Sequence, residues 1–478
     1  MIDVVFLSLV LLAPTFPQDS HAPAAARANV ASAAGNWLGT IEVGGAKIRL
    51  GFHLKQDEDR DWSGTVDSPD QNVMGTKLSR VDIDEDGSAF IAIKAWGAKF
   101  DGRFEGEPPR FVGTFSQLGR DVPLVLERVE RIDGPNRPQE PKPPFPYRVE
   151  EVSYESLDAD VELAASLTLP EGAGPFPAVV MITGSGPQDR DETLAGHKPF
   201  AVIADFLTRR GIAVLRADDR GTAASTGSFP GATTFDFAKD AEGGVNFLKR
   251  RPEIDPKRIG LIGHSEGGII APIVAARSSD VAFIVMLAGT GIPGDEILRM
   301  QTRLMAKAAG TDDATLDLSE SVNVKLYEIV KREPAGPALV GKLVAKIDEE
   351  KRGKTAAEQR VCDGLKASVP ALANVWNKAF LSYDPRPTLE KVKCPVLALN
   401  GSKDLQVPPK ENLAGIAAAL KSGGNADVTV TEIPGLNHMF QPTETGAPIE
   451  YQQIPTTFDP GALSIIGDWI TKRFGKKA

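Results

Sequence analysis

The sequence has few of the residues that build metal sites and disulfide frameworks. Its 478 residues include two cysteines, Cys362 and Cys394, which do not form a Cys-x-x-Cys pair. Zinc ribbons and small disulfide-rich domains need several cysteines at close spacing, so neither is expected. We interpret the two thiols as buried side chains and expect neither a metal nor a cofactor.

An excess of basic charge and a long apolar run are also missing. Lys and Arg number 54 against 64 Asp and Glu, which gives a formal net charge of −10. A negative surface repels phosphate backbones and anionic headgroups, so nucleic acid and anionic membranes are not expected partners. The apolar run at residues 4–12 is too short to span a bilayer. We therefore expect no stable membrane insertion of the mature protein.

Residues 1–28 resemble an export signal. The apolar run is followed by small residues at 20–22 and 25–28, as in a signal-peptide cleavage region. One feature is atypical, because Asp3 precedes the run and no Lys or Arg does. We interpret the segment as a signal peptide and expect an exported protein, periplasmic or secreted. The alternatives are a disordered start or a misplaced initiator.

Residues 36–130 carry the pattern of half-buried strands. Apolar side chains alternate with Lys47, Arg49, Gly51 and His53, which is the period of a β-strand. Seven similar short runs are separated by Gly, Asp and Pro, at residues 37–43, 62–66, 77–83, 89–95, 99–104, 110–115 and 123–129. Eight such strands without a helical segment predict a small antiparallel all-β domain, barrel-like or a sandwich.

A proline-rich segment follows this domain. It contains Pro135, Pro138, Pro141, Pro143, Pro144 and Pro146. Because proline is stiff and lacks a backbone N–H, we interpret residues 131–147 as an interdomain linker.

Residues 148–478 show a different pattern, that of an α/β domain. Eight mostly continuous apolar runs predict strands buried on both faces, at residues 149–154, 161–169, 178–182, 213–217, 259–262, 282–287, 396–399 and 428–433. Helical patterns lie between most of them, at residues 199–210, 235–251, 268–277, 410–421 and 461–474. This alternation predicts a mainly parallel eight-stranded sheet flanked by helices. A long helical insert at about 294–380 interrupts it, and we interpret the insert as a cap over the carboxyl edge of the sheet.

The chain is organised around the sequence Gly-His-Ser-Glu-Gly at residues 263–267. It lies between the predicted strand 259–262 and the predicted helix 268–277. A serine between two glycines at such a junction is typical of a nucleophile elbow, where the turn leaves no room for flanking side chains. The elbow predicts Ser265 as the nucleophile, and it places the N–H of Glu266 at a helix N-terminus, where negative charge is stabilised.

The base that would activate this serine can be sought among five histidines. His21 lies in the signal region, His53 on a β-domain strand, and His264 in the elbow with its side chain expected to point away. His438 follows the last predicted strand, in a loop that can reach back to Ser265, so it is our predicted base. His197, at the start of a helix, is the alternative.

The predicted acid is Asp404, because it directly follows the strand at 396–399 and so lies at the same sheet edge as the elbow. Asp384, just before that strand, is the alternative. For the oxyanion we expect two backbone donors, the N–H of Glu266 and that of Ser185 in the glycine-rich loop after strand 178–182. Gly186 is the alternative to Ser185.

These motifs together resemble the α/β-hydrolase superfamily. They are most similar to exported bacterial serine esterases related to dienelactone hydrolases and, more distantly, to prolyl-oligopeptidase-type enzymes. The matching segments follow in the family's order, nucleophile before acid before base, at residues 183–191, 219–221, 263–267, 401–404 and 437–438. Two departures are Thr183, where many relatives carry histidine, and a less glycine-rich stretch after Gly221. The resemblance implies ester hydrolysis through an acyl-enzyme, without a cofactor.

We therefore expect a serine hydrolase for small carboxylic esters with short acyl or aryl groups. An amidase or peptidase would use the same triad and stays open. A non-catalytic binding protein would need a missing triad member, and Ser265, Asp404 and His438 are all present. Nothing in the sequence indicates an oligomeric state.

Overall fold

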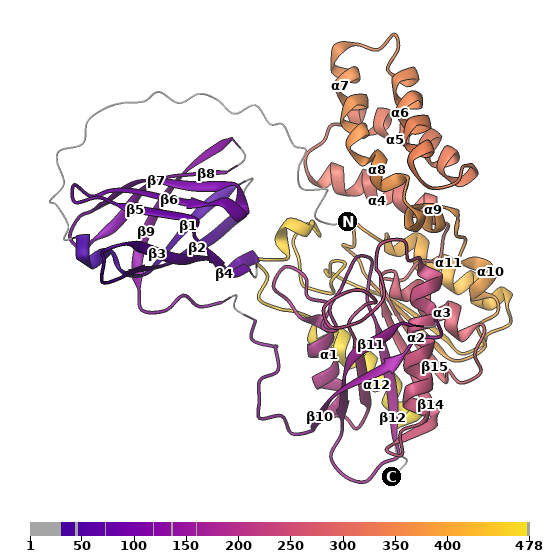
Figure 1. Ribbon diagram of the computed structural model, residues 1–478. Helices are drawn as coiled ribbons and strands as arrows, with labels where there is room; N and C mark the ends of the chain where they lie inside the picture. Colours follow the sequence, from indigo (N-terminus) through magenta and orange to yellow (C-terminus); the bar gives the residue numbers. More distant parts are fainter. Residues whose placement is uncertain are drawn as a thin grey trace.

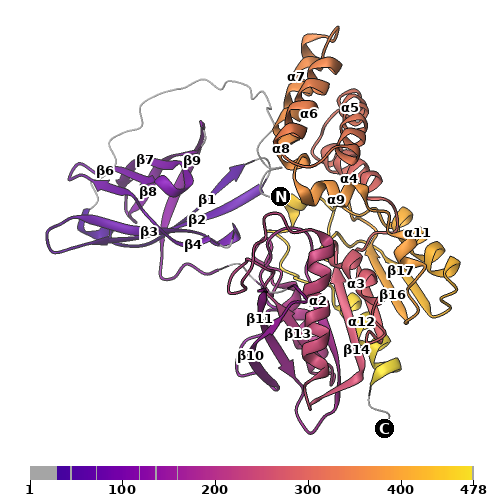
Figure 2. The same cartoon turned by 45° about the vertical axis from the view of Figure 1, so that its right-hand side comes forward.

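The computed structural model describes residues 30–43, 46–71, 73–117, 119–134, 137–158 and 160–475. The predicted signal segment, with His21, lies outside the described residues. The rest forms an antiparallel β domain and a larger α/β domain with a helical insert, and the two domains stand as separate bodies in both views (Figures 1 and 2). This architecture confirms the predicted fold class. Within the described ranges, no helix is both long and apolar enough to cross a membrane.

The β domain is one curled antiparallel sheet. Its order is β4-β3-β2-β1-β9-β8-β7-β6-β5, so the two edge strands follow each other in the chain. Leu78, between them, continues the β3–β4 pairing, because its N–H donates to Gly64 O of β3 at 3.0 Å. The other edge strand, β5, also contacts β3, so the sheet curls back on itself. The strands are β1 (Gly35–Val43), β2 (Ala46–Gln56), β3 (Trp62–Ser68), β4 (Val73–Lys77), β5 (Arg80–Ile83), β6 (Ser88–Ile93), β7 (Ala98–Glu105), β8 (Arg110–Gln117) and β9 (Arg120–Val129).

The predicted strand at residues 77–83 is two strands in the structure. β4 ends at Lys77 and β5 begins at Arg80. The sequence misses β4 because its side chains are nearly all exposed and show no alternation of apolar and polar residues. In the core, Trp37 is fully buried and packs edge-on against Phe104 and Phe111. This tryptophan therefore serves packing rather than a ligand cavity.

The α/β domain is built on an eight-stranded sheet of order β10-β11-β13-β12-β14-β15-β16-β17. Pairing is antiparallel at β10–β11–β13 and parallel across the rest. The strands are β10 (Arg148–Glu155), β11 (Glu162–Leu169), β12 (Phe176–Ile182), β13 (Ala213–Ala217), β14 (Ile254–His264), β15 (Phe283–Leu287), β16 (Val396–Gly401) and β17 (Val428–Ile433). The central strands are continuously buried, as their unbroken apolar runs predict.

Helices cover both faces of this sheet. One face packs against α2 (Thr234–Lys249), α3 (Gly267–Ala275), α10 (Arg386–Leu389) and α11 (Pro409–Ser422). The other packs against α1 (Pro199–Thr208) and α12 (Pro460–Phe474). Ser265 lies at the junction of β14 and α3, so its loop is held between the sheet and the first of these helical layers.

The helical insert is a small bundle with its own core. It comprises α4 (Gly294–Ala308), α5 (Asp313–Arg332), α6 (Pro337–Glu350), α7 (Ala356–Leu365), α8 (Val369–Leu372) and α9 (Val375–Ser382). Leu326, Leu343, Ile347 and Cys362 are fully buried in it. Both views show the bundle projecting from one end of the α/β domain, with α9 nearest to the sheet (Figures 1 and 2).

Candidate active site

Ser265 sits in a strained elbow between β14 and α3. Its φ is +52°, a left-handed conformation that costs a non-glycine residue about 1–2 kcal/mol. The turn is fixed on both sides, because the Ser265 N–H donates to Leu287 O at 2.8 Å and the Gly268 N–H donates to Ser265 O at 2.9 Å. Strain of this kind persists only where the surroundings impose it, and it often marks a functional residue.

The flanking glycines leave no room for side chains. A Cβ on Gly263 would lie 2.0 Å from the carbonyl oxygen of Gly267. A Cβ on Gly267 would lie 2.2 Å from the carbonyl oxygen of Ile182, at the end of β12. Both distances are far below van der Waals contact, so the turn requires glycine at each position.

The structure brings Asp404 and His438 together at the same sheet edge. Asp404 Oδ2 lies 2.8 Å from His438 Nδ1, and both side chains are buried. Asp404 Oδ1 accepts the backbone N–H groups of Gln406 and Val407 at 2.8 and 2.9 Å. With Nδ1 bonded to the carboxylate, Nε2 is the ring nitrogen left for proton transfer. Asp384, the alternative acid, is instead a surface residue paired with Arg386.

His264 forms a second buried pair beside this one. Its Nδ1 lies 2.9 Å from Glu192 Oε1, and its Nε2 lies 3.0 Å from the carbonyl oxygen of His438. Because both partners are acceptors, both ring nitrogens are donors in the protonated imidazole. Burial disfavours that charge, but Glu192 and the His438 carbonyl outweigh it and raise the pKa of His264. Glu192 could not be found from the sequence, because 72 residues separate the two partners.

The glycine-rich loop after β12 touches the nucleophile. A Cβ on Gly184 would lie 3.2 Å from Ser265 Cβ. The Gly184 N–H is already used, since it donates to Glu192 Oε1 at 2.6 Å. In the described part of the chain, no hydrogen-bond acceptor is found for the N–H groups of Ser185, Gly186 and Glu266. The two amides that the sequence predicts as oxyanion donors and the alternative, Gly186, are therefore all available.

The Asp219 carboxylate braces this loop. It accepts the Thr183 hydroxyl at 2.6 Å and the Gln188 N–H at 2.9 Å. Burial raises the pKa of Asp219 well above its ordinary value. Thr183, which stands where many relatives of the resembled family carry histidine, is therefore held in place by its hydrogen bond to Asp219.

The side chain of Glu266 joins three segments around the site. Its buried carboxylate accepts the Thr234 hydroxyl of α2 at 2.6 Å and the Trp376 indole N–H of α9 at 2.8 Å. It also accepts the Ser185 hydroxyl. Burial raises the pKa of Glu266, and the three donors oppose that rise. One carboxylate therefore connects the elbow, the glycine-rich loop after β12 and the helical insert.

His197, the alternative base, is occupied elsewhere. It is fully buried, with Nδ1 at 2.9 Å from Thr457 Oγ1 and Nε2 at 2.8 Å from Tyr451 O. Burial and the nearby Arg137 lower its pKa to about 4. The ring is therefore neutral near pH 7, and both of its nitrogens are bonded to groups outside the predicted triad.

This neutral histidine should make the fold sensitive to acid. Its pKa falls from 6.5 when exposed to about 4 when folded. The full contribution of the neutral ring to the free energy of unfolding is therefore present above pH 6.5. It is lost as pH falls toward 4, a change of about 3 kcal/mol. In urea unfolding at pH 7.5, 5.5 and 4.5, His197→Asn should lose less stability than wild type over this window. Equal losses in the two proteins would contradict the assignment.

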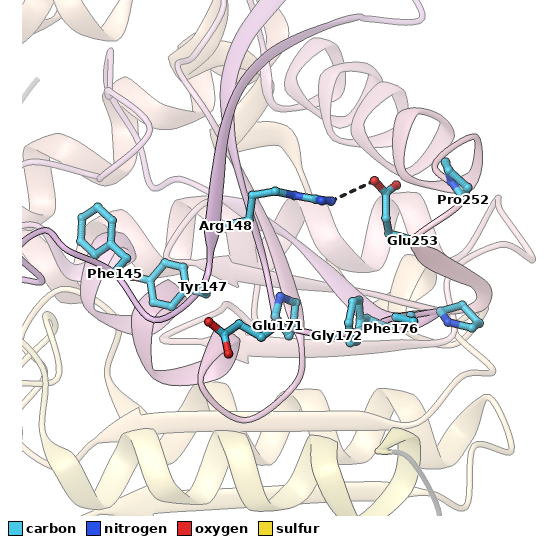
Figure 3. Close-up of a pocket in the computed structure, with 12 residues that line it drawn as sticks. Phe145, Tyr147, Arg148, Glu171, Gly172, Phe176, Pro252 and Glu253 are labelled. Atoms are coloured by element: carbon cyan, nitrogen blue, oxygen red, sulfur yellow. Dashed lines mark hydrogen bonds and ion pairs between the residues drawn. The ribbon is translucent and has the colours of Figure 1, made fainter.

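A cavity of about 670 Å³ lies at the opposite end of the sheet, near the amino-terminal ends of β12 and β14 (Figure 3). Its lining includes Arg148 at the start of β10, Phe176 at the start of β12, and Glu253 just before β14. Arg148 and Glu253 form an ion pair of 2.9 Å, drawn as a dashed line in Figure 3. Because Ser265, Asp404 and His438 follow the carboxyl ends of their strands, this cavity is not the candidate active site.

Comparison with known proteins finds similarity to a peptidase family, to esterases and to a thioesterase. The family model for X-Pro dipeptidyl-peptidase (S15 family) matches residues 158–426. Esterase EstD of Thermotoga maritima is 27% identical over 333 residues, which cover 69% of this chain and 70% of EstD. Mitochondrial acyl-coenzyme A thioesterase 2 of Rattus norvegicus is 28% identical over 179 residues, 35% of this chain and 36% of that protein. The solved Pyrococcus furiosus esterase Pf2001 is 17% identical, with a TM-score of 0.41, over 69% of this chain and 94% of that structure.

Proposed function

The chain belongs to the X-Pro dipeptidyl-peptidase (S15) family and is a hydrolase, and we propose that it cleaves carboxylic esters with short acyl or aryl groups. The observation that carries this proposal is the strained Ser265 elbow together with the Asp404–His438 pair, which the ring of the adjacent His264 joins to the elbow through the His438 carbonyl at 3.0 Å. The likeness to an esterase over two thirds of both chains supports esters as the substrate class.

The proposed reaction proceeds through an acyl-enzyme. His438 takes the proton of Ser265 as its oxygen attacks the ester carbonyl, and Asp404 holds the imidazole in the required tautomer. The amides of Glu266 and Ser185 donate to the oxygen that becomes negative. His438 then gives its proton to the leaving alcohol, and water, activated by the same histidine, releases the acid.

Cleavage of amides is the second candidate. The family name describes a peptidase, and the same three residues would serve, with His438 protonating the leaving amine. What separates the two reactions is the leaving group, because an amine must be protonated before it departs and a phenolate need not be.

Matched substrates separate these candidates. We expect kcat/KM for nitrophenyl acetate and butyrate, corrected for uncatalysed hydrolysis, to exceed that for the corresponding nitroanilides by about 10³-fold or more, because the phenolate leaves without being protonated. At about 1.4 kcal/mol for each factor of ten, this ratio corresponds to a barrier difference of about 4 kcal/mol. A dipeptidyl Xaa-Pro nitroanilide tests the peptidase reaction directly. If that anilide is the best substrate, the ester proposal is wrong. A fluorophosphonate that fails to label Ser265 would instead favour a non-catalytic binding protein.

We also propose that the protein is exported. The support is the apolar run at residues 4–12 and the small residues that follow it. N-terminal sequencing of the mature protein tests this, and a chain that still begins at Met1 would contradict it.

A further inference from the structure

The segment between the two domains is packed against the α/β domain. Arg137 is 8% exposed. Its guanidinium donates to four backbone carbonyls, those of Ala195 and Gly196 at 3.0 and 3.1 Å, and those of Gln452 and Ile454 at 2.9 and 3.2 Å. The first two belong to the turn that follows the glycine-rich loop at residues 183–187, here called the oxyanion loop. The last two belong to the segment that follows His438.

Gln139 binds the second of these segments as a strand partner would. Its Oε1 accepts the N–H groups of Thr457 and Phe458 at 2.6 and 3.0 Å. Its Nε2 donates to Phe458 O at 2.7 Å. One side chain thus satisfies three backbone groups of a loop that joins no strand.

From this point a continuous set of hydrogen bonds reaches the predicted acid. His197 joins the two anchored segments through Thr457 and Tyr451. The Tyr451 hydroxyl accepts Gln406 Nε2 at 3.0 Å, and the Gln406 N–H donates to Asp404 Oδ1 at 2.8 Å. From His197 to Asp404, the side chains along this path are buried.

The anchored turn also reaches the nucleophile. Glu192, in the turn before Ala195, has a strained φ of +52°. Its carboxylate binds both the Gly184 N–H of the oxyanion loop and the His264 ring beside Ser265. The linker therefore contacts both the segment that is hydrogen-bonded toward Asp404 and the turn that holds the oxyanion loop.

We propose that Arg137 and Gln139, here called the linker clasp, are positioning residues for the reaction. The clasp holds the turn after the oxyanion loop against the segment after His438, and so fixes Asp404 and the oxyanion loop relative to Ser265. This inference rests on the proposed hydrolase function.

Physical reasons single out arginine at position 137. Its planar guanidinium carries five N–H donors in a fixed fork, which suits several carbonyls at once, whereas lysine offers a point charge. Removing it takes the guanidinium donor from four buried or part-buried carbonyls, and a polar group left unpaired in such a place destabilises the arrangement that holds it. The loops would then move apart to reach water, and the site would lose its geometry.

The test uses the full chain with point variants. Arg137→Met and Gln139→Leu remove the clasp contacts, and Arg137→Lys keeps only the charge. Arg131→Met is the matched control, because Arg131 lies in the same segment with its side chain 81% exposed. For each protein, kcat and KM are measured with the best nitrophenyl ester, below its melting temperature and across pH 5–9.

We expect Arg137→Met and Gln139→Leu to lower kcat at least tenfold with KM within twofold, and to shift the acid limb of the kcat profile. Arg137→Lys should recover part of the loss, and Arg131→Met should match wild type. A clasp that only stabilises the fold would lower the melting temperature and leave kcat and the pH profile unchanged, which overturns the proposal.

A second measurement does not depend on turnover. Amide hydrogen exchange at residues 441–459 should become at least tenfold faster in Arg137→Met and stay unchanged in Arg131→Met. A wild-type protein that is inactive on every substrate would defeat the proposed function. Unchanged exchange would defeat the clasp, whether or not the wild type is active.

Discussion

Replacing Ser265 with alanine is expected to lower kcat for ester hydrolysis by about 10⁴- to 10⁶-fold, since loss of a nucleophile typically removes all catalysis except substrate binding and oxyanion stabilisation. The reason is that no acyl-enzyme can form without the hydroxyl. The measurement is the steady-state rate with nitrophenyl butyrate, with fluorophosphonate labelling to exclude wild-type contamination. Rates near those of wild type would show that another residue is the nucleophile.

Ser265→Gly is the matched control for the fold. Both variants lack the hydroxyl, but only glycine adopts a φ of +52° without strain. We expect the glycine variant to be as inactive as the alanine variant and more stable in urea unfolding by about 1 kcal/mol. Equal stability of the two variants would mean that the elbow stores no strain at this residue.

The elbow and the strand ends could be predicted because their signals are local. The apolar run of β14, the two glycines and the small residues of α3 lie within one short stretch. Asp404 and His438 lie far apart in the chain, but each follows a strand of a parallel sheet, and such strands end at one edge. Topology alone therefore predicts that the two side chains lie close together.

The supports of the site could not be predicted because their partners are distant in the sequence. Glu266 binds Trp376, 110 residues away, and Arg137 binds Ile454, 317 residues away. Neither contact leaves a periodicity or a spacing in the chain. The proline content predicts a stiff linker, but the linker packs against the α/β domain through Arg137 and Gln139. Nothing in the sequence distinguishes these two residues from an arginine and a glutamine that are exposed to solvent.

Buried ionisable side chains surround the oxyanion loop, where their charge affects the proposed reaction. Three buried carboxylates, Glu192, Asp219 and Glu266, surround the loop, and a negative charge there would oppose an oxyanion. The cationic form of His264 is favoured beside Glu192, which places a positive charge next to one of the three. Burial raises the pKa of Asp219 and of Glu266, so the charged form of each is disfavoured relative to an exposed carboxylate.

Asp404→Asn is expected to lower kcat by about 10⁴-fold, the size of loss seen when a triad carboxylate becomes an amide. The orientation of the new amide is set by the structure. Its oxygen must keep the place of Oδ1, which accepts the Gln406 and Val407 N–H groups. The amide nitrogen then faces His438 Nδ1 and donates to it, so Nε2 carries the proton and cannot accept one from Ser265.

Asp384→Asn is the control, since Asp384 is the other acid that the sequence allows. Its carboxylate pairs with Arg386 at the surface, so we expect kcat within twofold of wild type. Both variants should unfold close to wild type, because Asp404→Asn keeps its two backbone contacts. If Asp404→Asn retains more than a tenth of kcat, or Asp384→Asn loses most of it, then Asp404 does not orient the base.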